Sequence, residues 1–146
     1  MHTRLFYFLL ISLFLTNCNG KSKSIERLTT VVMMTNLIKD SSVYKLYDSL
    51  HSKNSIWPAV KIANKKSGIQ EIEIYRYEDK VVMMYSYPSD ANIAEMDSLY
   101  ISSDPNIKVW GNLMSSLQRS LPGLDTSKKW VTMKLIHHYK DGDYLK

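Results

Sequence analysis

The chain has 146 residues, of which 45% are hydrophobic and 23% charged, with a formal net charge of +5 and a single cysteine. Basic residues are scattered among acidic ones, and this pattern excludes the basic patch of a nucleic-acid-binding protein and the polybasic segment of a membrane-surface protein. A lone cysteine excludes a disulfide framework within the chain.

The first residues are typical of a secretion signal. Arg4 precedes a mainly apolar run from Leu5 to Leu15, only about half as long as a membrane-spanning helix. Residues 15–18, Leu-Thr-Asn-Cys, are similar to the lipobox of bacterial lipoproteins, where the signal is cut before a cysteine that then carries acyl chains. The alternative is a plain secretory leader followed by an incidental buried cysteine.

From this pattern we expect three segments. Residues 1–17 form a lipoprotein signal peptide, residues 18–25 a flexible tether that starts at the lipidated Cys18, and residues 26–146 one folded domain. The protein is then anchored to a membrane through lipid alone, on the periplasmic side and in particular at the outer membrane. With Cys18 committed to lipid, stability must come from a packed core.

The domain begins with a predicted strand and a helical region. Residues 27–35 alternate β-branched residues and methionine on two faces, as in a strand. Residues 43–67 follow Asp40-Ser41-Ser42, any of which can cap a helix, and end before Gly68, a typical helix stop. Trp57-Pro58 must interrupt this region, because proline suits a first helical position and disfavours helix in the residue before it.

The rest of the domain is predicted to contain two strands, a second helical region and a last strand. Residues 69–77 and 80–87 form a predicted hairpin around Glu78-Asp79, and residues 89–102 show helical spacing. Asp104-Pro105 predicts the cap and first turn of another helix, whose apolar stripe includes Trp110. Residues 128–139 alternate as a last strand.

This order predicts an α+β fold, the ferredoxin-like β-α-β-β-α-β arrangement with an antiparallel four-stranded sheet and helices on one face. Several strands carry apolar residues on both faces, so the face away from the helices needs a cover. We expect a second copy of the domain, packed sheet against sheet in a dimeric α/β barrel and homodimer. The alternative is a sheet open to water with a few exposed apolar side chains.

The stretch from Val43 to Val60 holds the candidate chemistry. Tyr47 and His51 are four residues apart and therefore project from one helix face. Taken alone, the segment also fits an ordinary amphipathic helix followed by a surface or capping histidine.

A series of short motifs decides between these interpretations. Tyr47-x-x-x-His51, Ile56-Trp57-Pro58, Gly68 before a strand with Ile74-Tyr75, and Asp104-Pro105 before Trp110 follow one another between about Thr29 and His138. In order and spacing they resemble the L-rhamnose mutarotase family. The gap between His51 and Trp57 is two residues longer than in the family pattern. Ile72 stands in place of a tyrosine, and Val109 in place of the first tryptophan of a pair.

The resemblance implies an aldose mutarotase that interconverts the α and β anomers of a 6-deoxy monosaccharide such as L-rhamnose. His51 is then the general acid/base, Tyr47 binds substrate, and Trp110 stacks on the sugar or packs in the core. Positions 72 and 109, here Ile72 and Val109, belong to the family's sugar site. A histidine exchanges protons near neutral pH, and the reaction needs no cofactor.

Two other classes of function remain open at this point. One is a lipid-anchored, non-catalytic sugar-binding or interaction module of the same fold. The other is a cofactor-free oxygenase or a haem-binding protein, which also occur on dimeric ferredoxin-like barrels. No His or Cys cluster has ligand spacing, and the neighbouring His137 and His138 point to opposite faces of a strand, so we predict no metal.

Overall fold

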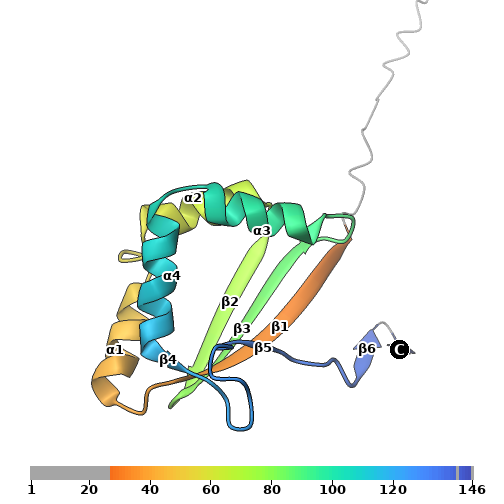
Figure 1. Ribbon diagram of the computed structural model, residues 1–146. Coiled ribbons are helices and arrows are strands. Elements are labelled where there is room, and N and C mark those ends of the chain that lie inside the picture. Colours follow the sequence, from red (N-terminus) through yellow and green to blue (C-terminus); the bar gives the residue numbers. More distant parts are fainter. Residues whose placement is uncertain (1–26, 141, 146) are drawn as a thin grey trace, which may run out of the picture.

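The computed structural model describes residues 27–140 and 142–145 (Figure 1). The predicted signal peptide, the tether and Cys18 therefore lie outside the described residues. The elements, in chain order, are β1 (Leu28–Leu37), α1 (Ser41–Leu50), α2 (Pro58–Ser67), β2 (Glu71–Tyr77), β3 (Lys80–Pro88), α3 (Ile93–Ser102), α4 (Asn106–Leu117), β4 (Gln118–Arg119), β5 (Val131–Thr132), β6 (His138–Lys140) and β7 (Asp143–Leu145).

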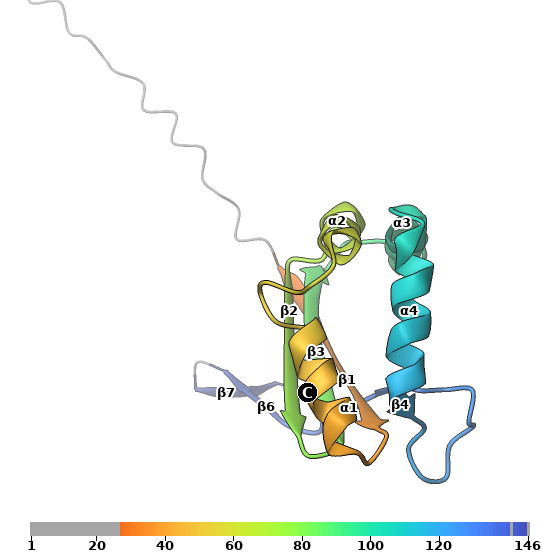
Figure 2. The same cartoon turned by 90° about the vertical axis from the view of Figure 1, so that its left-hand side faces the viewer.

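The main sheet is antiparallel and has the order β2-β3-β1-β4. β2 and β3 form the predicted hairpin, in which Tyr77 pairs with Lys80 across two turn residues. Glu78 takes a left-handed φ of 49° in that turn, the backbone geometry that two-residue hairpins favour. The predicted ferredoxin-like α+β arrangement is confirmed, with helices α1 to α4 on one face of the sheet (Figure 2).

Local signals set the helix ends. The Asp40 carboxylate accepts a hydrogen bond of 2.7 Å from the Ser42 backbone N–H and so caps α1. Pro58 occupies the first turn of α2, and Gly68 ends that helix at a φ of 81°. The Asp104 carboxylate accepts from the Asn106 N–H at 2.8 Å, as expected of a cap before α4. The predicted bend between two short helices is confirmed.

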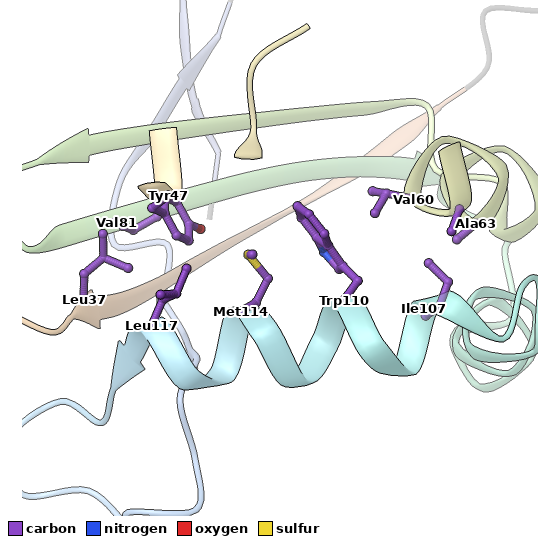
Figure 3. Packing of buried hydrophobic residues seen from close by; sticks show 10 residues of the cluster. Leu37, Tyr47, Val60, Ala63, Val81, Ile107, Trp110, Met114 and Leu117 are labelled. Carbon is purple, nitrogen blue, oxygen red and sulfur yellow. The ribbon is translucent and has the colours of Figure 1, made fainter. Parts of the chain in front are cut away.

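The core lies between the helices and the sheet. Figure 3 shows Trp110 and Met114 projecting from α4 towards the strands, with Leu117 beside Tyr47 at one end and Ile107 near Val60 at the other. Trp57 and Trp130 are partly buried against this cluster. The core thus runs along the inward face of α4, from Ile107 to Leu117.

The predicted last strand is wrong over most of its length. Only Val131–Thr132 pairs with β1, beside the other short strand Gln118–Arg119. Residues 138–140 turn away to pair with residues 143–145 in a separate hairpin. Alternating polarity shows that a segment can form a strand, whereas a strand also needs a neighbour to pair with. The apolar side chains of Leu135 and Ile136 are consequently 70% and 90% exposed.

The sheet face away from the helices carries apolar side chains, as predicted. Val32, Met34, Val82 and Met84 lie on this face and are half-buried. The segment 132–138 crosses part of it and encloses a groove of about 560 Å³ with Thr30, Val32 and Met84. Figure 2 shows β6 and β7 on this side, opposite α4.

Candidate active site

A cavity of about 490 Å³ lies between the helices and the sheet. This volume falls within the range of small-molecule sites. Its walls come from helices α1 to α4, the connection between α1 and α2, and strands β2 and β3. The residues that line it are Tyr47, Asp48, His51, Ile56, Val60, Asn64, Ile72, Ile74, Arg76, Met83, Tyr100 and Trp110. The cavity is mostly apolar, with a few polar groups at fixed positions.

Tyr47 and His51 share one wall, as their helical spacing predicts. Their ring centroids are 4.2 Å apart, and His51 is the residue that ends α1. His51 Nδ1 lies 2.8 Å from the Tyr47 carbonyl oxygen. Because a carbonyl oxygen only accepts, Nδ1 carries the proton and donates it, which leaves Nε2 of the neutral ring without a proton.

Burial keeps both side chains neutral. It raises the pKa of the Tyr47 phenol to about 12, although the Gln118 side chain beside the hydroxyl opposes this. Burial also lowers the pKa of His51 below its ordinary 6.5, against the opposing influence of the bond to the Tyr47 carbonyl and of the Asp48 charge. At neutral pH, His51 therefore offers an unprotonated Nε2, the form that accepts a proton.

Trp110 closes the cavity beside the histidine. Its ring meets the edges of His51 and Trp57, each at a centroid distance of 5.4 Å, and only 6% of its surface is exposed. Beyond it the space continues into a second cavity of about 560 Å³, which also borders Tyr47 and His51. Trp110 is thus both a core residue and a wall of the site.

An ion pair that the sequence did not reveal also lines the cavity. Arg76 of β2 binds both carboxylate oxygens of Asp48, at 2.7 and 2.6 Å. Its guanidinium carbon lies 5.3 Å from the centre of the Tyr44 ring, in a cation–π contact. The Arg76 hydrogen bond holds the pKa of Asp48 below its usual value, so a carboxylate stays charged one helical turn from His51.

The structure places four of the five predicted sugar-site residues in one cavity. Tyr47, His51, Ile72 and Trp110 line it together. Val109 does not, and is 53% exposed on α4, because neighbouring helical residues point about 100° apart and Trp110 faces inward. Val109 therefore points away from the cavity that the other four residues line.

Sequence reasoning missed two further groups of residues in the cavity wall. Asp48 and Arg76 pair across 28 positions of the chain. Asn64 of α2 and Tyr100 of α3 face the cavity from separate helices. Their helical spacing placed Asn64 and Tyr100 on amphipathic helices, but no short-range signal showed that their inward faces meet at one cavity.

Within the described ranges, 27–140 and 142–145, no group of three or more His, Cys, Asp or Glu side chains is placed to hold a metal ion. None of the helices there is both long and apolar enough to span a bilayer.

Comparison with known proteins shows to which family the chain belongs. The family model for L-rhamnose mutarotase matches residues 30–139. An L-fucose mutarotase of Xanthomonas campestris pv. campestris is 32% identical over 107 residues, which cover 73% of this chain and 82% of that protein. The crystal structure of an L-rhamnose mutarotase from Formosa agariphila has the same fold, with a TM-score of 0.53, 16% identity, and coverage of 77% of this chain and 99% of that one. The chain therefore belongs to the L-rhamnose mutarotase family.

Proposed function

We propose that this protein interconverts the α and β anomers of a 6-deoxy sugar such as L-rhamnose or L-fucose, with His51 as the general acid/base. The observation that carries the proposal is the bond from His51 Nδ1 to the Tyr47 carbonyl oxygen, at 2.8 Å. It fixes the tautomer and leaves Nε2 as the proton acceptor of a residue that lines the cavity.

The reaction needs one proton to leave the anomeric hydroxyl and one to reach the ring oxygen. His51 Nε2 accepts the proton of the anomeric hydroxyl and delivers it to the ring oxygen. The bond between C1 and the ring oxygen then breaks as the C1 carbonyl forms. After rotation about the C1–C2 bond, the C5 hydroxyl formed from the ring oxygen adds to the other face of the aldehyde. His51 takes the proton of this hydroxyl and passes it to the former carbonyl oxygen.

Other wall residues orient the sugar. Tyr47, neutral because burial raises its pKa to about 12, keeps a hydroxyl that can donate or accept. The Trp110 ring offers an aromatic surface to the apolar C–H face of the sugar. The Asp48 carboxylate, three residues before His51, stabilises the imidazolium that forms transiently.

Optical rotation tests the proposed substrate class. A freshly dissolved single anomer of L-rhamnose, L-fucose or D-glucose relaxes to its equilibrium rotation spontaneously. We expect the protein to accelerate this relaxation for the two 6-deoxy sugars more than for glucose, because an apolar wall leaves the glucose 6-hydroxyl without a partner. Equal acceleration of all three sugars would contradict the proposed preference for a 6-deoxy sugar.

The pH profile follows from the lowered pKa of His51. Since the neutral ring is the base, kcat/KM should stay level above pH 6.5 and fall as the pH drops through the lower pKa of the folded state. Asp48→Asn removes a charge that favours the imidazolium and leaves Arg76 unpaired. The pH at which kcat/KM of this variant falls to half should therefore be lower still than in the parent protein. A midpoint that rises in this variant would contradict the account. Exchange rates measured between pH 4 and 9 provide the test.

We also propose a homodimer closed sheet to sheet. Its support is the half-buried apolar face of β1 and β3 together with the exposed Leu135 and Ile136. Light scattering on protein without the residues before Lys21 should give about twice the chain mass. The double variant Leu135→Lys/Ile136→Lys should weaken the dimer, whereas Leu99→Lys on α3, which is 40% exposed, should not. A monodisperse parent monomer at micromolar concentration would rule the dimer out.

We further propose that the mature chain starts at a lipidated Cys18 and sits at the periplasmic side of a bacterial membrane. The support is the apolar run of residues 5–15 that leads to the lone cysteine. Mass spectrometry of the membrane-extracted protein should show an acylated Cys18 terminus, and Cys18→Ser should abolish acylation. An unmodified thiol at Cys18 in soluble protein would contradict this anchor.

A further inference from the structure

The main cavity has a side chamber next to Ile72. This side chamber, of about 290 Å³, shares Asn64, Ile72, Met83 and Tyr100 with the main cavity. Shared walls mean that the two spaces adjoin. Ile72 is half-buried at their boundary, and an isoleucine has no hydroxyl to offer there.

The side chamber is largely apolar. Its remaining walls include Met33, Ile69, Ile93 and Met96. Its polar residues besides Asn64 are Tyr85 and Tyr100, the exposed Asp97, and Ser67, whose hydroxyl already donates to the Asn64 backbone carbonyl at 3.1 Å. A sugar hydroxyl placed against the apolar walls, away from these groups, would lose its hydrogen bonds to water without replacement. An apolar group has no hydrogen bonds to water to lose.

One polar atom at the boundary lacks a partner. Asn64 Oδ1 is buried and has no hydrogen-bond partner among the residues that the structure describes. A buried acceptor of this kind is costly unless a ligand or water satisfies it. Other atoms of Asn64 line both the main cavity and the side chamber, so a rotation of the side-chain amide would bring Oδ1 to a donor of a bound sugar.

We propose that the substrate is a deoxy sugar with an apolar substituent, such as an ether or ester group, on one ring hydroxyl. The substituent enters the side chamber, and a neighbouring hydroxyl of the same sugar donates to Asn64 Oδ1. This inference rests on the proposed function, since it places the sugar in the same cavity as His51. A single C6 methyl group is much smaller than the chamber, so a 6-deoxy sugar alone leaves it mostly empty.

Titration calorimetry on the detergent-solubilised full chain tests the inference. The probes are L-rhamnose and L-fucose, with the methyl and ethyl ethers of each at O2, O3 or O4. For one ring position, affinity should rise about fourfold with each added carbon, the gain expected for burying one methylene group. Anomer exchange of the same probes is measured in parallel.

Two variants locate the substituent. Ile93 is 44% exposed and lines only the side chamber, so Ile93→Trp should fill that space at little cost to the fold and abolish the gain from the ethers. Leu99 on the same helix is 40% exposed and lines neither space, so Leu99→Trp should retain the gain. Asn64→Leu should lower the affinity for all the sugars about 2- to 12-fold, the range for one lost hydrogen bond.

The outcomes separate this inference from the proposed function. If the plain sugars exchange faster but no ether binds more tightly than its parent sugar, the side-chamber inference is overturned and the mutarotase proposal stands. If an ether binds more tightly and Ile93→Trp removes the gain, but no probe exchanges faster, the chamber inference stands and catalysis fails. If Ile93→Trp and Leu99→Trp behave alike, the substituent does not occupy the chamber.

Discussion

His51→Ala should slow anomer exchange by a factor of about 10² to 10⁴, the contribution that a positioned acid/base group typically makes. The imidazole is the one group in the 490 Å³ cavity wall whose ordinary pKa lies near neutrality, at 6.5. Tyr47, with a pKa of about 12, cannot replace it as a base near pH 7. The variant should retain sugar binding, because the other walls of the cavity are unchanged.

Two controls separate chemistry from structure in this experiment. His51→Asn keeps an N–H that can donate to the Tyr47 carbonyl but cannot carry a proton between two oxygens, so it should lose as much activity as alanine. His138→Ala removes a histidine from β6, outside the cavity wall, and should exchange sugar at the parent rate. A His51→Ala protein that is folded and as fast as the parent would remove His51 from the reaction.

Trp110→Ala should lower the free energy of unfolding by about 3–5 kcal/mol, the cost of truncating a large buried aromatic residue. Trp110 is 6% exposed and packs with Ile107, Met114 and Leu117 along the buried face of α4. Its loss would widen the opening between the main cavity and the second cavity beside it. Denaturant unfolding of the parent and the variant measures the difference.

Trp110→Ala should also change the pKa of His51. Water entering beside His51 would relieve its burial, so the pKa of His51 should rise towards its ordinary value of 6.5. Trp130→Ala, which removes a partly buried tryptophan at the edge of the cluster, should cost less stability and leave the pKa of His51 unchanged. A loss below about 1 kcal/mol for Trp110→Ala would contradict its place in the core.

The parts of the fold that the sequence predicted are those that local chemistry determines. Pro58 and Gly68 fix the ends of α2 through backbone geometry that each residue carries with it. Tyr47 and His51 meet because helical spacing alone puts them on one face. These features need no knowledge of distant residues.

The parts that the sequence did not predict depend on distant partners. Residues 133–137 alternate in polarity like a strand but leave the edge of β1 after the bond from the Met133 N–H to the Val32 carbonyl, at 2.8 Å. The pair of Asp48 with Arg76 joins two elements that are 28 residues apart. Asn64 looks like any polar residue of an amphipathic helix until α3 and the sheet enclose it.

Saturation transfer between the α and β anomeric protons, measured by NMR on L-fucose and L-rhamnose at equilibrium, tests the central claim most directly. The method follows anomer exchange itself without a coupling enzyme and separates catalysis from binding. We expect the parent protein to speed exchange of at least one of these sugars at neutral pH, and we expect His51→Asn not to do so. Sugar that binds the parent protein yet exchanges only at the spontaneous rate would contradict the central claim and identify a non-catalytic sugar-binding protein.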